Sequence, residues 1–219
     1  MTPSRRKGGL PDHIRPGARV LFVGINPGLR SAAVGHHFAG HSNRFWRLMV
    51  ESGLLPERLG WRDDARLPLY GYGITNLVRR ATAGIDALRA GEYRRGRRAL
   101  LSRIRRHRPE VVALVGLTID RVLFPGAARA PRPGLRHETL GRSAVFVLPN
   151  PSGRNATMTY AAMLAAFRAL RRHLDRTRPR RGRPRRYVRD SSGAAAARRA
   201  SPARSAPARP RRGRVRRGT

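Results

Sequence analysis

The sequence contains no cysteine, and this absence removes several kinds of chemistry at once. A chain without thiols forms no disulfide bonds, has no thiolate nucleophile, and holds no zinc ion or iron–sulfur cluster through cysteine. The composition fits a protein kept in a reducing compartment. We therefore predict a cytoplasmic location, at the nucleoid if the cell is bacterial.

Long apolar runs are also missing. No segment of the sequence approaches the roughly 20 consecutive apolar residues that a membrane-spanning helix needs. The first residues are basic, but they lead into a stretch rich in proline and charge at 11–16 rather than into an apolar core, so no secretory signal is visible. We expect no membrane partner.

Acidic residues are scarce. The chain has 12 Asp and Glu against 48 Lys and Arg, which gives a formal net charge of +36. A polyanion is the natural partner of such a protein. Nucleic acid is the first candidate, because its phosphates are dense and release counterions when a basic protein binds.

Both ends of the chain differ in composition from the middle. Residues 178–219 contain 16 arginines and one acid, Asp190, separated by Pro, Ala, Ser and Gly. No core can form there, so we predict a disordered basic tail over 177–219 that tethers the protein to a polyanion; a solubilising extension without a defined role is the alternative. Residues 1–18 are predicted to be a flexible lead-in, which leaves one domain over 19–176.

Apolar runs alternate with helical patterns along the domain. This order predicts an α/β fold, a three-layer sandwich with a central, mostly parallel sheet. Strands are expected at 19–24, 110–116, 137–140 and 144–148, with a short extended piece within 70–78; helices are expected at 43–53, 89–107, 117–123 and from 157 or 159 onward. Loops are expected at 29–42 and 124–134. The many arginines of the 89–107 helix are interpreted as a solvated face in preference to a specific phosphate track.

A Gly-Ile-Asn-Pro-Gly motif follows the first apolar run. The buried strand at 20–23 ends at Gly24, and Asn26 then precedes Pro27 and Gly28. Pro27 removes an N–H and biases Asn26 away from the helical region, while Gly28 tolerates a positive φ, so the chain turns sharply. Ligands of open α/β sheets bind beyond the carboxyl ends of the strands, which places Asn26 at the mouth of a crevice. An Asx-type turn that only caps the strand remains the alternative.

A second asparagine motif, Leu-Pro-Asn-Pro-Ser-Gly-Arg-Asn at 148–155, follows the last predicted strand and contains Asn150, Pro151 and Ser152. Together the two motifs closely resemble the mismatch-specific uracil/thymine DNA glycosylases, a branch of the uracil-DNA glycosylase superfamily. The resemblance runs from about 19 to 174 and includes residues 35–38, 43–46 and 73–78. It implies the superfamily's fold, a monomer, and duplex DNA with a mismatched or damaged pyrimidine as partner.

The resemblance assigns a chemical role to the first motif. It implies that Asn26 holds the water that attacks the sugar, that the backbone of Ile25 helps to read the pyrimidine, and that Phe38 stacks on the base. From the residue alone, Phe38 is equally an ordinary core aromatic. An amide is a poor base, so the glycosidic bond must loosen first, giving an oxocarbenium-like sugar and a departing pyrimidine anion.

Three further residues are expected around the base. By resemblance, His37 belongs to a His-His-aromatic arrangement typical of thymine-processing members, and Asn76 faces the pyrimidine edge, although turn capping is its alternative. Ser31 is expected near the pocket, where its hydroxyl would crowd or solvate a thymine methyl, so activity on G·T pairs stays open. Paired histidines at 36 and 37 suggest a metal, but no carboxylate or third histidine stands at suitable spacing, and we predict no metal site.

The second motif is expected to supply a wedge. Arg154 matches the position that enters the gap left by a flipped base and offsets part of the unstacking cost. Gly153, the neighbouring backbone and Asn155 are expected to contact the opposite strand, which explains a preference for G·U or G·T pairs. Ordinary turn chemistry is the alternative for Asn150, Ser152 and Asn155.

The predicted function is a monofunctional DNA glycosylase that excises uracil, or a mismatched or damaged pyrimidine, and starts base excision repair. The sole lysine, Lys7, lies in the lead-in, so no Schiff-base lyase is expected, and no cofactor is predicted. One rival is a catalytically inactive, base-flipping module that binds nucleic acid. The other is a small-nucleotide enzyme, which the missing Gly-x-Gly-x-x-Gly and Walker-type motifs disfavour.

Overall fold

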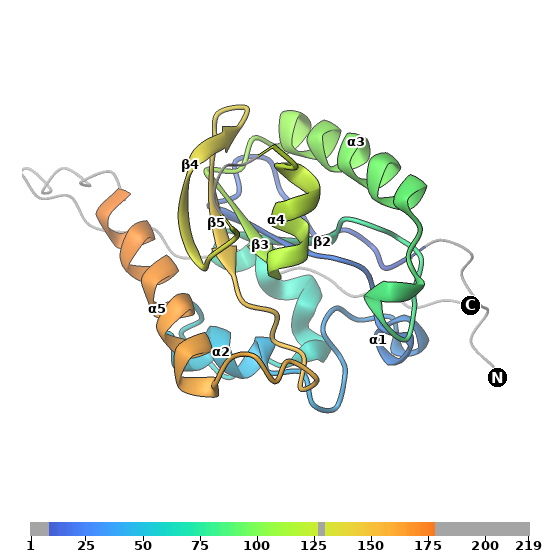
Figure 1. Cartoon of the computed structure of the whole chain (residues 1–219). Coiled ribbons are helices and arrows are strands. Elements are labelled where there is room, and N and C mark those ends of the chain that lie inside the picture. Colours follow the sequence, from blue (N-terminus) through green and yellow to red (C-terminus); the bar gives the residue numbers. More distant parts are fainter. Residues whose placement is uncertain (1–8, 127–129, 178–219) are drawn as a thin grey trace, which may run out of the picture. The chain divides into compact units, whose positions relative to one another are not determined.

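Figure 1 shows the computed structural model of the chain, which describes residues 9–126 and 130–177. The tail predicted from composition lies outside the described residues, apart from Thr177, and so do the first eight residues of the predicted lead-in. None of the helices in the described ranges is both long enough and apolar enough to cross a lipid bilayer.

The core of the fold is a five-stranded sheet in the order β2-β1-β3-β5-β4. Its strands are β1 (Val20–Gly24), β2 (Tyr72–Asn76), β3 (Val111–Val115), β4 (Gly134–Leu140) and β5 (Ser143–Leu148). The first four in spatial order run parallel, and β4 pairs antiparallel with β5. Every residue of β1, β2 and β3 is buried, as expected of parallel strands covered on both faces. The prediction of an α/β fold with a mostly parallel sheet is confirmed.

Helices cover both faces of the sheet, which gives the three predicted layers (Figure 1). The helical segments are α1 (Leu29–Val34), α2 (Phe45–Glu51), η1 (Trp61–Tyr70), η2 (Ile85–Ala87), α3 (Ala90–His107), α4 (Leu117–Leu123) and α5 (Tyr160–Thr177). Side chains alternate across β1, so Phe22 packs with the core under α2 and α5, while Leu21 packs with the core under α3 and α4. Each face therefore has its own apolar core.

Two helical segments, α1 and η1, were not predicted from the sequence. The segment 29–42 begins with α1, which follows the extended Gly28 and ends at Gly35 in the left-handed conformation, with φ 79°. The six residues of α1 lack an apolar stripe, because only Ser31 is buried, so the helical periodicity that sequence reasoning uses is absent. The 3-10 helix η1 was also missed; it contains Pro68, which normally signals a break.

The segment 9–18 is folded, contrary to the prediction of a flexible lead-in. Leu10 and Ala18 are buried, and His13 exchanges backbone hydrogen bonds with Ile74 at 3.1 and 2.9 Å. This antiparallel bridge covers the outer edge of β2, which would otherwise expose unpaired backbone groups. The segment has no regular periodicity, and its order comes from tertiary contacts that no local pattern announces.

The four parallel strands end at one edge of the sheet. Gly24 pairs with Asn76 in register, and Val115 pairs with Leu148. Both asparagine motifs follow these strand ends, so the topology brings 24–28 and 148–155 together at the edge where ligands of α/β sheets bind.

Candidate active site

A cavity of about 450 Å³ opens at this edge of the sheet, within the size range of small-ligand pockets. Its lining comes from the turn after β1, the loop before α2, the loop after β2 and the second asparagine motif. The predicted site residues that line it are Ile25, Asn26, Pro27, Gly28, Ser31, Phe38, Asn76, Asn150, Ser152 and Arg154. Sequence reasoning therefore located ten of the 22 lining residues.

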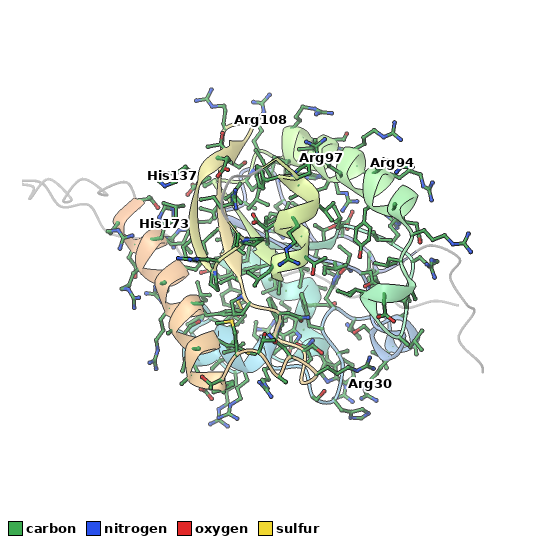
Figure 2. The ribbon with its side chains drawn as sticks, viewed as in Figure 1. Arg30, Arg94, Arg97, Arg108, His137 and His173 are labelled. Atoms are coloured by element: carbon green, nitrogen blue, oxygen red, sulfur yellow. The ribbon has the colours of Figure 1, made fainter. Side chains whose placement is uncertain are left out.

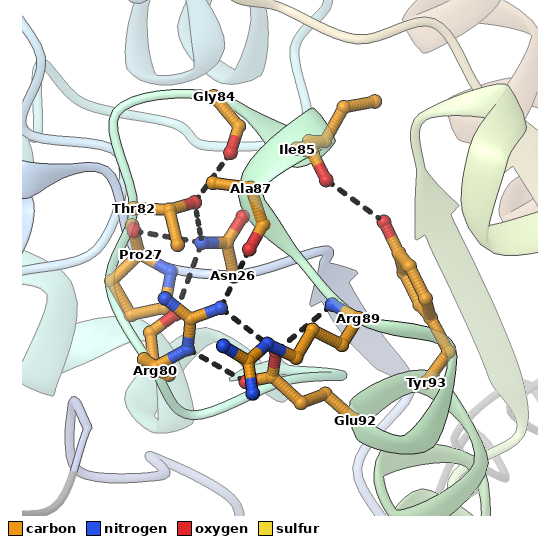
Figure 3. A network of polar contacts seen from close by, with 10 residues as sticks. All are labelled: Asn26, Pro27, Arg80, Thr82, Gly84, Ile85, Ala87, Arg89, Glu92 and Tyr93. Atoms are coloured by element: carbon orange, nitrogen blue, oxygen red, sulfur yellow. Dashed lines mark hydrogen bonds and ion pairs between the residues drawn. The ribbon is translucent and has the colours of Figure 1, made fainter.

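The side-chain amide of Asn26 is held through its nitrogen. Its Nδ2 donates to Thr82 Oγ1 at 2.7 Å, to the carbonyl oxygen of Arg80 at 3.0 Å and to that of Pro27 at 3.2 Å. Figure 3 shows the three contacts converging on this nitrogen. No residue in the described ranges donates a hydrogen bond to Asn26 Oδ1. The oxygen is therefore left as a hydrogen-bond acceptor on the cavity wall.

Thr82 and the two carbonyl oxygens together fix which way the Asn26 amide points. The Thr82 hydroxyl donates its single proton to the carbonyl oxygen of Gly84 at 2.6 Å, so towards Asn26 the same oxygen can only accept. An amide nitrogen, and not an amide oxygen, must then face Thr82. The backbone N–H of Thr82 also donates to the Pro27 carbonyl at 3.1 Å, which ties the loop after β2 to the first motif.

The loop that carries Thr82 is anchored to α3 by an ion pair (Figure 3). Arg80 donates to both carboxylate oxygens of Glu92, at 2.7 and 2.8 Å, and also to the Ala87 carbonyl at 2.7 Å. Glu92 in turn accepts from the backbone N–H of Arg89 at the start of the helix. The Arg80 hydrogen bonds, with the Arg89 backbone N–H, lower the pKa of Glu92 to about 2, so its carboxylate stays charged. Bidentate geometry of this kind fixes orientation as well as distance.

Phe38 presents an aromatic ring to the cavity. One face of the ring stacks on Phe45, with centroids 4.1 Å apart and planes 16° apart, and the residue adopts a φ of 53°. Gly24 makes room for this arrangement, because a Cβ there would lie 3.2 Å from Phe38 Cζ and 2.7 Å from Asn76 Oδ1. The result is a flat apolar wall beside a buried amide oxygen.

His37 lies behind the cavity and is absent from its lining, which differs from its predicted place beside the base. It is buried, and its Nε2 lies 2.9 Å from the Pro11 carbonyl oxygen, which can only accept, so Nε2 carries the proton. Burial lowers the pKa of the imidazole, which favours the neutral ring and leaves Nδ1 as an acceptor for Asn76 Nδ2 at 3.2 Å. His37 thereby turns the amide nitrogen of Asn76 away from Gly24 and leaves the Asn76 oxygen at the cavity floor.

Ser31 and Ile25, two further predicted site residues, each form a hydrogen bond within the protein. Ser31 is buried and its Oγ accepts a hydrogen bond from the Ala39 N–H at 3.0 Å. The backbone carbonyl of Ile25 accepts from the Val78 N–H at 2.7 Å. Both residues still line the cavity.

The second motif is built as a self-supporting turn. Asn150 Oδ1 accepts from the Ser152 N–H at 3.0 Å, and Asn155 Nδ2 donates to the Asn150 carbonyl at 2.9 Å. Pro151 is buried and its carbonyl accepts from the Arg44 N–H at 2.9 Å. Pro151 and Asn155 do not line the cavity, and the polar atoms of this turn are largely satisfied by turn chemistry.

Gly153 does not line the cavity, whereas the next residue, Arg154, does. A Cβ on Gly153 would overlap Ser42 Cβ and lie 2.9 Å from the Ser42 carbonyl oxygen, so only glycine fits between the two loops. Arg154 is exposed and lines the cavity, and its guanidinium donates to the Ala83 carbonyl at 2.8 Å. Its side chain thus links the second motif with the loop that holds Asn26.

A carboxylate and a third histidine do approach the His37 ring, a grouping that the sequence spacing did not indicate. Ligand atoms of His13, His37 and Asp64 lie within 4.8 Å of one another. Most of these atoms already have partners: the His37 ring nitrogens contact Pro11 and Asn76, and Asp64 accepts from the His37 N–H and contacts His36 Nδ1 at 2.9 Å. The three residues are therefore better explained as a hydrogen-bonded cluster around the buried Asp64 carboxylate than as the ligands of a metal ion.

With this geometry established, comparison with known families decides the relationship. The family model of the uracil DNA glycosylase superfamily matches residues 11–174. The chain belongs to this superfamily. Membership implies DNA N-glycosylase activity on uracil, with DNA as the partner. The match begins at residue 11, within the segment that packs on β2, which agrees with a folded domain that starts before Arg19.

Sequence reasoning missed the loop after β2 as part of the candidate active site of this uracil DNA glycosylase superfamily member. Thr82 and Arg80 hold Asn26, and Ala83, Gly84, Ile85 and Asp86 line the cavity. The loop has no apolar periodicity, and its role depends on contacts with residues more than 50 positions earlier. The only available signal was that a Thr-Ala-Gly sequence follows shortly after a strand end.

Proposed function

We propose that the protein is a monofunctional DNA glycosylase that excises uracil from mismatches with guanine and leaves an abasic site for base excision repair. The observation that carries the proposal is the Asn26 amide: its nitrogen is tied by three acceptors, and its oxygen is an open acceptor on the cavity wall. A water that donates one proton to this oxygen would be held with its lone pair free for attack.

The reaction needs little from Asn26 as a base. A uracil flipped out of the duplex would enter the cavity, and its C1′–N1 bond would break with the electron pair moving to N1. The water held by Asn26 then bonds to C1′ of the oxocarbenium-like sugar and releases a proton, which neutralises the uracil anion directly or through solvent. Asn26 positions the nucleophile, which favours a dissociative path over proton abstraction.

Asn76 supports a preference for uracil over cytosine. Its nitrogen is engaged with His37 Nδ1, so its oxygen is the group available to a base at the cavity floor. Uracil carries a hydrogen on N3 that can be donated to this oxygen, whereas neutral cytosine has an N3 lone pair that would be repelled. Phe38 supplies the flat surface on which either ring would stack.

Arg154 is proposed as the wedge. It is exposed at the cavity mouth, and its present hydrogen bond to the Ala83 carbonyl is one that DNA could replace with base or phosphate contacts. In the proposal, the side chain enters the gap in the duplex, and the turn at 150–155 faces the opposite guanine. Ser31, whose Oγ already accepts one hydrogen bond, stays beside the position of a thymine methyl, so G·T activity is expected to be weaker than G·U activity.

The test is strand scission by alkali after single-turnover incubation with oligonucleotides that contain G·U, G·T, A·U or single-stranded U. Wild type is expected to cut G·U fastest, and Asn26→Ala to lose at least about 100-fold in rate through the misplaced water. Asn26→Ala should still bind a duplex with an abasic site, which serves as the control for folding. Wild-type protein that binds G·U duplexes without cutting them would instead establish an inactive base-reading module.

The wedge has its own discriminating measurement. Arg154→Ala should slow excision from the G·U duplex by about 10-fold, because the flipped state loses the group that fills the gap. Excision from single-stranded U needs no gap to be filled and should change little. Equal losses on both substrates would remove the wedge assignment and leave Arg154 as part of the cavity wall.

A further inference from the structure

The outer face of α3 carries the largest set of exposed arginines on any helix in the described ranges. These arginines, here called the α3 arginine face, are Arg94, Arg95, Arg97, Arg98, Arg105 and Arg106. None of them forms a hydrogen bond or an ion pair with another described residue. The only acid on the helix is Glu92, and both of its carboxylate oxygens are bound by Arg80.

The spacing of these arginines places three of them along one line. At 3.6 residues per turn, Arg94, Arg98 and Arg105 fall within about 40° of one another around the helix axis, with the other members on the flanks. Arg94 and Arg98 are separated by about 6 Å along the axis, and Arg98 and Arg105 by about 10 Å. The opposite side of α3 buries Gly96, Leu100 and Ile104 against the sheet, so the arginine face points outward.

Such an arrangement is unfavourable for an isolated domain. Like charges three or four residues apart on a helix repel, and Arg94, Arg97 and Arg98 stand at such separations. The helix dipole favours Arg105 and Arg106, which lie in the last turn, but it gives no benefit to Arg94 and Arg98. A partner with negative charges would relieve this repulsion.

The α3 arginine face is separate from the cavity. No residue of α3 lines the cavity. Figure 2 shows Arg94 and Arg97 at one end of the view and the cavity residue Arg30 at the other. Large exposed apolar side chains are also missing from α3, since those in the described ranges are Leu29, Leu69, Ile85 and Leu135. The face therefore lacks the apolar groups that a membrane-inserting helix or an apolar protein interface uses.

We propose that the α3 arginine face is a second binding surface for duplex DNA, which contacts phosphates of a segment other than the one examined by the cavity. Its occupant is undamaged duplex, because arginines that contact phosphates bind DNA without reading its base sequence. The protein would hold one duplex on α3 while the cavity is occupied by another. This surface does not depend on the glycosylase proposal, since phosphate binding needs no catalysis.

The experiment compares two charge-matched variants of the full chain. The test variant carries R94Q, R98Q and R105Q, and the control carries R168Q, R172Q and R176Q, exposed arginines on α5. Glutamine keeps helix propensity, and both variants retain the basic tail. Binding of a fluorescein-labelled undamaged duplex is followed by anisotropy over a series of NaCl concentrations. The log–log salt slope of the test variant should be shallower by about 3, one for each lost phosphate contact, and that of the control unchanged.

A co-binding measurement separates this surface from the cavity and from the tail. The cavity is first saturated with a donor-labelled duplex that contains an abasic-site analogue, and an acceptor-labelled undamaged duplex is then added. Wild type, the α5 control and Asn26→Ala should give energy transfer, and the α3 variant should lose most of it. Co-binding retained by the α3 variant, or lost equally by the α5 control, would overturn the proposal in favour of the tail or of net charge alone.

Discussion

The two asparagine motifs look alike in sequence but are used differently in the structure. Each places an Asn-Pro pair after a parallel strand, at one edge of the sheet, with β3 lying between the two strands. Asn26 is held through its nitrogen by a distant loop, and its oxygen remains open to the cavity. Asn150 uses its oxygen within its own turn, by accepting from the Ser152 N–H. The residue type thus offers the same atoms in both places, and the contact partners decide which atom stays available for chemistry.

The largest effect, and the sharpest test of this difference, is expected from removal of the Thr82 hydroxyl. In Thr82→Val, the Asn26 nitrogen loses its shortest hydrogen bond, and only the Arg80 and Pro27 carbonyl oxygens, at 3.0 and 3.2 Å, still hold the amide. Single-turnover excision should fall by about 100-fold, because a misplaced nucleophile costs about this much. Thr82→Ser keeps the hydroxyl and should retain most of the rate. An unchanged rate in Thr82→Val would weaken the comparison, since Asn26 would then not depend on the Thr82 hydroxyl.

The next largest effect is expected on stability, from substitution of Gly153 in the second motif. Gly153→Ala places a Cβ against the side chain and the carbonyl oxygen of Ser42, so one of the two loops must move. Overpacking of this kind costs about 1–3 kcal/mol in the free energy of unfolding. Denaturant titration followed by circular dichroism measures this cost. Gly126→Ala is the control, since a Cβ there meets no atom of the described residues within 4 Å; similar losses in both variants would show that loop packing is not the cause.

Asn150→Ala should have a smaller effect than either. It removes the hydrogen bond from the Ser152 N–H, which is worth about 1 kcal/mol, and it loosens the turn without touching Asn26. We expect a lower unfolding midpoint and an excision rate within a few-fold of wild type. If Asn150→Ala were as inactive as Asn26→Ala, the second motif would also take part in the chemistry, and the distinction between the motifs would fail.

The smallest expected effect is the pH dependence of the free energy of unfolding that arises from His37. This residue also orients the neighbouring Asn76 amide. Burial lowers the pKa of His37, whereas the unfolded chain titrates near 6.5, so below that pH the unfolded state binds the extra proton. The free energy of unfolding should therefore fall as the pH drops from about 6.5. His37→Gln should make this decline shallower, with a remainder from His173, whose pKa burial also lowers. Equal declines in both proteins, measured by thermal unfolding, would show that His37 does not cause the decline.

Apolar strands and their polar ends were accessible from the sequence. The runs in β1, β3 and β5 are continuous because parallel strands are buried on both faces, and this composition marked the positions of Asn26 and Asn150 in advance. Helix α1 and the segment 9–18 escaped prediction for the opposite reason. They carry no apolar periodicity, and they are ordered by neighbours far away in the chain.

By itself, the sequence determined the positive charge, the apolar strands and the placing of an asparagine after two of them. These properties depend on composition and on neighbouring residues, so local physical rules suffice to infer them. Only the tertiary structure decided that the Asn26 oxygen is open, because its nitrogen is bound by residues 54 and 56 positions later in the chain. Long-range hydrogen bonds follow from the way the loops pack across the sheet edge, and no pattern within a single segment encodes that packing.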